Sequence, residues 1–148
     1  MSSTIHNETP RFHVTVTRTS PKMARAEAHG QVLDLAIKGR DPTLGFTAPE
    51  TLLAAFGACI LSNVTRNAAE MGLAVQAAEV VFDAAKHLDP LGIDPLSYRL
   101  TLRSDEPAAR LQELYRKVTT DGTATNALLR GVKPAGQLVV EPTPETQQ

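Results

Sequence analysis

The single cysteine, Cys59, is the residue of this sequence whose type offers the most chemistry. A thiolate is a strong nucleophile and a target of oxidants, but one thiol can neither close an intramolecular disulfide nor build a cysteine-based zinc site. Three interpretations follow: a buried small hydrophobe, a lone reactive thiol, or half of a bond to another molecule. A position about ten residues inside a predicted helix favours the first, because the helix dipole activates thiols only near the N-terminus.

The helix that carries Cys59 is predicted over residues 49–71. Thr47 and Glu50 have the spacing of a capping box, so capping alone accounts for the glutamate. Gly72 stands where a helix of this length would end. The thiol therefore lies in the longest predicted element of the chain.

Small side chains on this helix favour the close approach of another helix near Cys59. Gly57 costs about 1 kcal/mol relative to alanine inside a helix, which indicates that a contact requires it. The crossing partner is either the second sizeable predicted helix, residues 107–119, or the same helix of a second subunit. The small residues are Ala54, Ala55, Gly57 and Ala58.

The remaining predicted elements place the chain in the α+β class. Strands and helices are segregated along the sequence, and the first three strands form an antiparallel meander. Loops are expected at 38–46 and 87–95, where glycine and proline gather. Strands are expected at 11–18, 23–28, 31–37, 75–84, 96–103 and 137–140, and a short helix at 126–129.

Length and composition predict one domain of ordinary globular character. We expect that domain to span residues 11–141, between a flexible start (1–10) and a flexible tail (142–148). The net charge of −1 and the pI near 6.4 argue against nucleic acid or an anionic membrane as the partner. The absence of a long apolar run and of a signal-peptide pattern favours a cytoplasmic protein.

The histidines give no sign of a metal site. The chain has four of them, and none has the helical i, i+4 spacing of a ligand pair. We therefore expect neither a metal nor another cofactor.

The helix motif resembles that of the OsmC/Ohr family, in which Pro-x-Glu-Leu-Leu-Leu-Ala-Ala-Leu-Gly-Ser-Cys follows a three-stranded meander. The proline comes one place later here. The resemblance implies an OsmC-like α+β fold with antiparallel sheets around a long central helix. It also implies an intertwined homodimer with active sites at the subunit interface. The matching segment is Pro49-Glu50-Thr51-Leu52-Leu53-Ala54-Ala55-Phe56-Gly57-Ala58-Cys59.

In peroxidase members of that family the helix cysteine attacks an organic hydroperoxide, and a glutamate and an arginine hold its thiolate. The resemblance assigns these roles to Cys59 and Glu50, and Arg25 is the best placed arginine, with Arg18 and Arg40 as rivals. Glu50 and Cys59 are separated by about 13 Å of helix rise and roughly half a turn of rotation. A joint role therefore requires Glu50 of the other subunit.

The family's second, resolving cysteine has no counterpart. Its motif, Cys-Pro-Val-Ser/Thr-x-x-Leu, aligns with the segment from Gly122 to Leu128, and Gly122 stands at the cysteine position. The internal dithiol cycle is therefore absent, and a sulfenic acid on Cys59 needs an external thiol or Cys59 of a neighbouring subunit as reductant.

Two functions follow from these residues. The first is a one-cysteine peroxidase that reduces organic hydroperoxides in oxidative stress defence. The second is a non-catalytic dimer that binds a small apolar or electrophilic ligand in a groove lined by Leu52, Phe56 and Ile60. A thiol hydrolase ranks last because no histidine can be placed beside Cys59.

Overall fold

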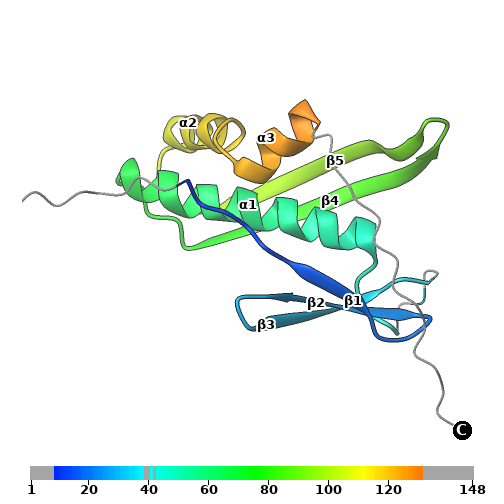
Figure 1. The fold of residues 1–148 in the computed structure, drawn as a ribbon. Helices are drawn as coiled ribbons and strands as arrows, with labels where there is room; N and C mark the ends of the chain where they lie inside the picture. Colours follow the sequence, from blue (N-terminus) through cyan, green and yellow to red (C-terminus); the bar gives the residue numbers. More distant parts are fainter. Residues whose placement is uncertain (1–8, 39–40, 42, 132–148) are drawn as a thin grey trace, which may run out of the picture. The chain divides into compact units, whose positions relative to one another are not determined.

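The structure is a computed structural model of the chain, and it describes residues 9–38, 41 and 43–131. The chain divides into two compact units, which we describe separately. Unit 1 comprises Met1–Ala58 and Glu79–Thr101, and unit 2 comprises Cys59–Ala78 and Leu102–Gln148. Figure 1 shows helices and strands segregated along the chain, which confirms the α+β class.

Unit 1 begins with an antiparallel three-stranded sheet in the order β1-β2-β3. Its strands are β1 (Thr15–Arg18), β2 (Met23–Ala28) and β3 (Gln31–Ala36). His29 and Gly30, with φ of 52° and 75°, make the tight turn between β2 and β3. The first strand is shorter than expected because Thr15 pairs with Glu27, and β2 ends at the next residue.

The long helix α1 (Ala48–Glu70) matches the prediction to within one residue at each end. At its start, the Thr47 N–H donates a hydrogen bond to Glu50 Oε2 at 3.1 Å, which is one half of the capping box. At its end, Gly72 has φ +66°, and the N–H groups of Gly72 and Leu73 donate to the carbonyls of Ala69 and Ala68. This is a Schellman motif, in which the left-handed conformation favours glycine.

The next two strands, β4 (Ala77–Leu88) and β5 (Leu91–Arg103), pair in a two-stranded sheet. They lie side by side over most of their length (Figure 1). The predicted loop over 87–95 is wrong, because only Asp89 and Pro90 separate the strands. A two-stranded sheet has only edge strands, and these tolerate a proline such as Pro95 within β5.

Unit 2 also contains α2 (Ala108–Val118) and α3 (Thr123–Arg130), close to the predicted helices. Its buried apolar side chains repeat every four residues on α1 and α2, which places them on one face of each helix. They are Ile60, Val64, Ala68, Leu114 and Val118. Among the described residues, no helix is long and apolar enough to cross a membrane.

Some predictions fall beyond the described residues. The strand expected at 137–140 and the tail at 142–148 lie outside them, as do residues 1–8 of the expected N-terminal segment. The limits of a single domain at 11–141 stay a prediction.

Candidate functional site

Cys59 lies in unit 2, on the second half of α1, with its side chain partly exposed. One turn further along the helix, the buried Asn63 extends its amide toward the thiol. Asn63 Nδ2 lies 3.6 Å from Cys59 Sγ and 2.9 Å from the Cys59 carbonyl oxygen. The sulfur therefore has a hydrogen-bond donor on one side, in a residue that is only partly buried.

Arg66 fixes the direction of that amide. Its Nη2 donates a hydrogen bond of 2.6 Å to Asn63 Oδ1. A guanidinium can only donate, so the oxygen of the amide must face Arg66 and the NH2 group must face Cys59. Arg66 also withdraws electron density from the amide and makes it a stronger donor to the sulfur.

Gly122, at the N-cap of α3, lies beside Cys59 within unit 2. A Cβ at this position would lie 2.8 Å from Cys59 Sγ, 2.7 Å from Thr125 Oγ1 and 2.9 Å from Asn63 Nδ2. Such distances are too short for any ordinary contact, so the close approach requires glycine. The position aligned with the family's second cysteine thus lies directly beside the thiol.

Thr125 completes the surroundings of Cys59 on the α3 side. Only 6% of the residue is exposed, and among the described residues its hydroxyl has no hydrogen-bond partner. An unpaired buried hydroxyl costs about 1–3 kcal/mol. The Thr125 hydroxyl therefore destabilises the reduced protein unless an acceptor reaches it.

Glu50 and Arg25 belong to unit 1 and have other partners there. Glu50 is exposed and accepts the hydrogen bond from Thr47. Arg25 Nε donates to Asp34 Oδ1 at 3.1 Å across paired strands, and both side chains are about half exposed. Of the rival arginines, Arg18 is exposed on β1 and Arg40 lies outside the described residues.

The three residues expected to line a groove occupy different environments. Leu52 is 44% exposed, whereas Ile60 is buried. The ring of Phe56 packs against Phe82 and Tyr98, with centroids 5.3 and 5.9 Å away. The contact expected at Gly57 from a crossing helix is made by Phe82, whose ring would lie 3.1 Å from an added Cβ.

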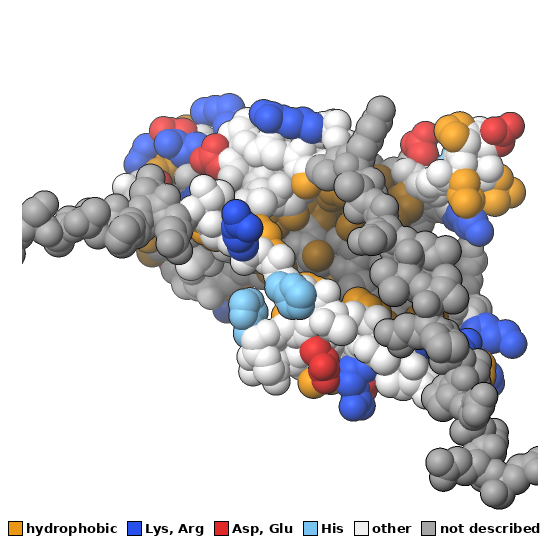
Figure 2. All heavy atoms as spheres, viewed as in Figure 1, with side chains coloured by type: hydrophobic (Ala, Val, Ile, Leu, Met, Phe, Trp, Pro, Cys, Tyr) orange, Lys and Arg blue, Asp and Glu red, His pale blue; other side chains and the backbone are white. Residues whose placement is uncertain are grey.

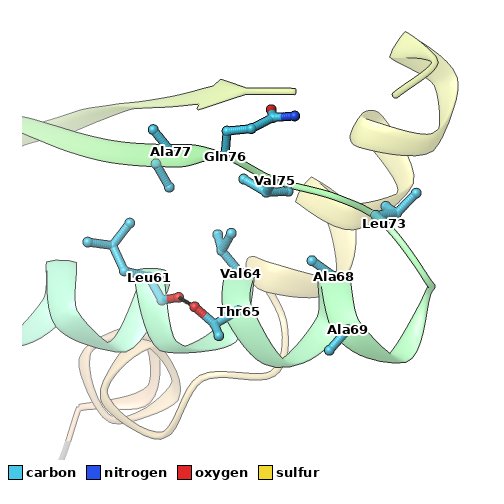
Figure 3. A pocket seen from close by; sticks show the side chains of 10 residues that line it. Leu61, Val64, Thr65, Ala68, Ala69, Leu73, Val75, Gln76 and Ala77 are labelled. Carbon is cyan, nitrogen blue, oxygen red and sulfur yellow. Dashed lines mark hydrogen bonds between the residues drawn. The ribbon is translucent and has the colours of Figure 1, made fainter. Parts of the chain in front are cut away.

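A pocket of about 420 Å³ lies in unit 2, beside the second half of α1. It is mostly apolar, with Thr65 and Gln76 as its polar side chains, and Figure 3 shows it between α1 and the segment that leads into β4. The pocket does not include Leu52, Phe56 or Ile60. Its lining residues are Leu61, Val64, Thr65, Ala68, Ala69, Leu73, Val75, Gln76, Ala77 and Ala78.

Within the described ranges, no group of three or more His, Cys, Asp or Glu side chains could hold a metal ion. The residues around Cys59 are instead neutral hydrogen-bond donors with one arginine behind them. Such an arrangement can hold an anionic sulfur or oxygen.

Sequence reasoning missed Asn63, Arg66 and Thr125. The spacing held a signal for the first two, because residues four apart on a helix share a face, which places Asn63 over Cys59. Thr125 falls on the Ser/Thr of the resolving-cysteine motif. Its burial without a partner becomes visible only when α3 is placed beside α1 within unit 2.

The family model described as "OsmC-like protein" matches residues 39–135. Among solved structures, an OsmC-like protein from Mycoplasma pneumoniae superposes with a TM-score of 0.75 at 16% identity, over 83% of this chain and 89% of that one.

Two further structures are named organic hydroperoxide resistance proteins. OhrB of Bacillus subtilis gives a TM-score of 0.58 at 19% identity, over 82% of this chain and 91% of its own. The protein from Legionella pneumophila gives 0.61 at 15% identity, over 84% and 93%. No curated protein matches the sequence. At these identities the likeness of the structures concerns the fold.

Proposed function

Since the chain belongs to the OsmC-like protein family, we propose that it reduces organic hydroperoxides through Cys59, with an external thiol or a second copy's Cys59 as reductant. Two proteins of similar fold carry names that describe organic hydroperoxide resistance, which supports a general stress-related role. A thiol-dependent reaction suits the reducing cytoplasm, where the proposal locates it.

The chemistry begins with the thiolate of Cys59. Its sulfur attacks the distal oxygen of the hydroperoxide, an S–O bond forms, and the O–O bond breaks. The leaving alkoxide takes a proton and departs as the alcohol. The peroxide has then been reduced by two electrons, and Cys59 has been oxidised to a sulfenic acid.

Recovery of the thiol requires two further thiol equivalents. The first attacks the sulfenic sulfur, releases water and forms a mixed disulfide, and the second reduces that disulfide and releases an external disulfide. When Cys59 of a second copy is the first thiol, the intermediate is an intersubunit disulfide.

The observation that carries this proposal is the environment of Cys59 Sγ. Cys59 is only partly buried, and its sulfur has the oriented Asn63 amide at 3.6 Å and faces Gly122, where a resolving cysteine would otherwise stand. A packed structural cysteine requires neither exposure nor an oriented donor.

A homodimer is part of the proposal, and exposed apolar side chains of unit 1 support it. Phe12 is 80% exposed, and Leu88 and Leu91, which flank the turn between β4 and β5, are 75% and 73% exposed. Figure 2 shows hydrophobic side chains together with acidic ones at this hairpin tip, at the upper right. Large apolar side chains left exposed in this way mark surfaces that another chain covers.

In such a dimer, Glu50 and Arg25 of one copy would act at Cys59 of the other. Both side chains are exposed, and their present partners are a backbone N–H and an exposed carboxylate. Exposed ion pairs contribute at most about 1 kcal/mol, so Arg25 can exchange Asp34 for a thiolate at little cost.

Cumene hydroperoxide with a dithiol tests the proposal. The wild-type protein is expected to consume the peroxide, and Cys59→Ser to lose that activity because its hydroxyl is a far weaker nucleophile. Equal consumption by the two proteins would overturn the proposal.

The pocket of about 420 Å³ supports the second candidate, a dimer that binds a small apolar ligand without turnover. Its volume lies within the range of ligand sites, and its lining is mainly aliphatic. The two functions separate under mild peroxide: an inert thiol indicates the binding protein, and a sulfenic or sulfinic product indicates the peroxidase.

A further inference from the structure

The hydroxyl of Thr125 is a buried donor that has no acceptor among the described residues, and it lies beside a thiol that gains an oxygen when it is oxidised. We propose that Thr125 Oγ1 and Asn63 Nδ2 donate hydrogen bonds to the oxygen of oxidised Cys59 and hold it as a long-lived sulfenic acid. This inference rests on the proposed function, since it concerns the intermediate of that reaction.

The burial of Thr125 is the first argument. The residue is 6% exposed, so bulk water cannot pair with its hydroxyl. Folded proteins rarely leave such a group unpaired, and the exceptions call for an explanation in terms of function. An acceptor that exists only in the oxidised protein supplies one, because the reduced thiol is a weak acceptor and a sulfenate oxygen is a strong one.

The convergence of the two donors is the second argument. Thr125 Oγ1, Asn63 Nδ2 and Cys59 Sγ all lie 2.7–2.9 Å from the point that a Cβ of residue 122 would occupy. An oxygen bonded to the sulfur on that side comes within hydrogen-bonding range of both donors. Gly122 presents only a hydrogen there, so no side chain at position 122 fills the space between the sulfur and the two donors.

Arg66 adds the third argument. Asn63 Oδ1 accepts a hydrogen bond of 2.6 Å from the Arg66 guanidinium. This bond fixes the amide with its NH2 group toward the sulfur. The arginine also places a positive charge behind the amide. The anionic form of a sulfenic acid gains from both effects, whereas a neutral thiol gains little.

The sulfenic acid is expected to persist between the peroxide step and the thiol step. In this chain no thiol stands at position 122 to consume the sulfenic acid. The oxygen stays on Cys59, held by Thr125 and Asn63, until an external thiol attacks the sulfur and water leaves. The proposal needs no reagent beyond the hydroperoxide and thiol already named.

The test measures the lifetime of the sulfenic acid. The protein is oxidised with one equivalent of cumene hydroperoxide and freed of oxidant, and the sulfenic acid is trapped with dimedone after increasing delays. Thr125→Val keeps the shape and removes the hydroxyl, and we expect it to shorten the lifetime about tenfold, the effect of one hydrogen bond to an anion. Thr125→Ser is expected to restore it.

Thr123→Val is the matched control, because Thr123 lies on the same helix turn with an exposed side chain. We expect the sulfenic acid of Thr123→Val to live as long as that of the wild-type protein. The proposal would be overturned if the sulfenic acid of Thr125→Val lived as long as that of the wild type. It would also be overturned if the sulfenic acid of Thr125→Ser were as short-lived as expected for Thr125→Val. If Thr125→Val fails to fold, Thr125→Ala removes the same hydroxyl without a new methyl group, and the same outcomes apply.

Failure of the proposed function gives a different result. In that case cumene hydroperoxide leaves Cys59 unoxidised in every variant. The sulfenic acid is then generated with excess hydrogen peroxide, and its lifetime is compared among the same proteins. The initial rate of oxidation, measured separately, tells whether Thr125 acts on the thiol or on its oxidised form.

Discussion

The polar side chains considered as site residues in the two units differ in exposure and in partners. In unit 1, Arg25 pairs with Asp34 and Glu50 caps α1, and all three side chains are exposed. In unit 2, Asn63 and Thr125 are buried around Cys59, and the Thr125 hydroxyl has no hydrogen-bond partner within the part of the chain that the structure describes.

The difference indicates which unit gains free energy when an anion forms at Cys59. An exposed pair loses little when it is exchanged for another partner, because water screens it in either arrangement. A buried unpaired donor carries a standing cost that an incoming acceptor removes. Unit 2 is thus prepared for a new anion at Cys59, whereas unit 1 offers side chains that are free to change partners.

The replacement Gly122→Cys has the largest expected effect, because it places a second thiol beside Cys59 in unit 2. Its Cβ would lie 2.8 Å from Cys59 Sγ, close to the roughly 3 Å between a Cβ and the partner sulfur of a disulfide, once Thr125 Oγ1 and Asn63 Nδ2 move back from it. We expect one equivalent of hydroperoxide to form a Cys59–residue 122 disulfide, seen by non-reducing peptide mapping. Thr123→Cys, one residue along with an exposed side chain, is the control and should not pair with Cys59. A persistent sulfenic acid in the Gly122→Cys protein would contradict the geometry.

Leu114→Ala, in the core of unit 2, and Leu91→Ser, on the apolar surface of unit 1, are expected to change different properties. Leu114 is fully buried, so its truncation should lower the free energy of unfolding by about 2–5 kcal/mol in urea denaturation. Leu91→Ser, at the exposed hairpin tip, should instead shift sedimentation toward the monomer. A dimer unaffected by Leu91→Ser would remove the tip from the proposed interface.

Gly122→Ala tests the crowding without adding a thiol. A methyl group at 2.7–2.9 Å from three atoms forces them apart, and we expect a loss of about 1–3 kcal/mol in the free energy of unfolding. Gly92→Ala is the matched control, because nothing lies within 4 Å of its added Cβ. Equal stabilities of the two variants would show that unit 2 tolerates a side chain at 122.

The ion pair of unit 1 gives the smallest expected effect. Arg25→Ala and Asp34→Asn both break the pair and should each change stability by less than about 1 kcal/mol. Only Arg25→Ala removes the cation, so only it should slow the oxidation of Cys59, by about tenfold, measured by stopped-flow with cumene hydroperoxide. Equal rates for both variants would exclude Arg25 from the site.

Much of the fold was predictable because its signals are local. The limits of α1 follow from Thr47, Glu50 and Gly72, which act within one turn of the helix ends. The two strands of the β4–β5 hairpin were predicted, but the turn between them was predicted too long, for the complementary reason. Pro90, Gly92 and Pro95 are typical of loops, and only the pairing of two edge strands makes a continuous hairpin of them.

The site was predictable in part. Cys59 and Gly122 followed from the resemblance of two short motifs, although they lie far apart in the sequence. The burial of Thr125 and the orientation of the Asn63 amide depend on how α3 packs within unit 2, which no local pattern encodes. Leu52, Phe56 and Ile60 follow one another at four-residue spacing on one side of α1, but their surroundings differ, because contacts from outside the helix cover them unequally.

The central claim is that Cys59 attacks an organic hydroperoxide and stops at a sulfenic acid. Intact mass spectrometry after one equivalent of cumene hydroperoxide, with dimedone present and Cys59→Ser in parallel, tests it most directly. The account predicts one dimedone adduct on the wild-type chain and none on the variant. An unmodified wild-type chain, or the same adduct on Cys59→Ser, would contradict it.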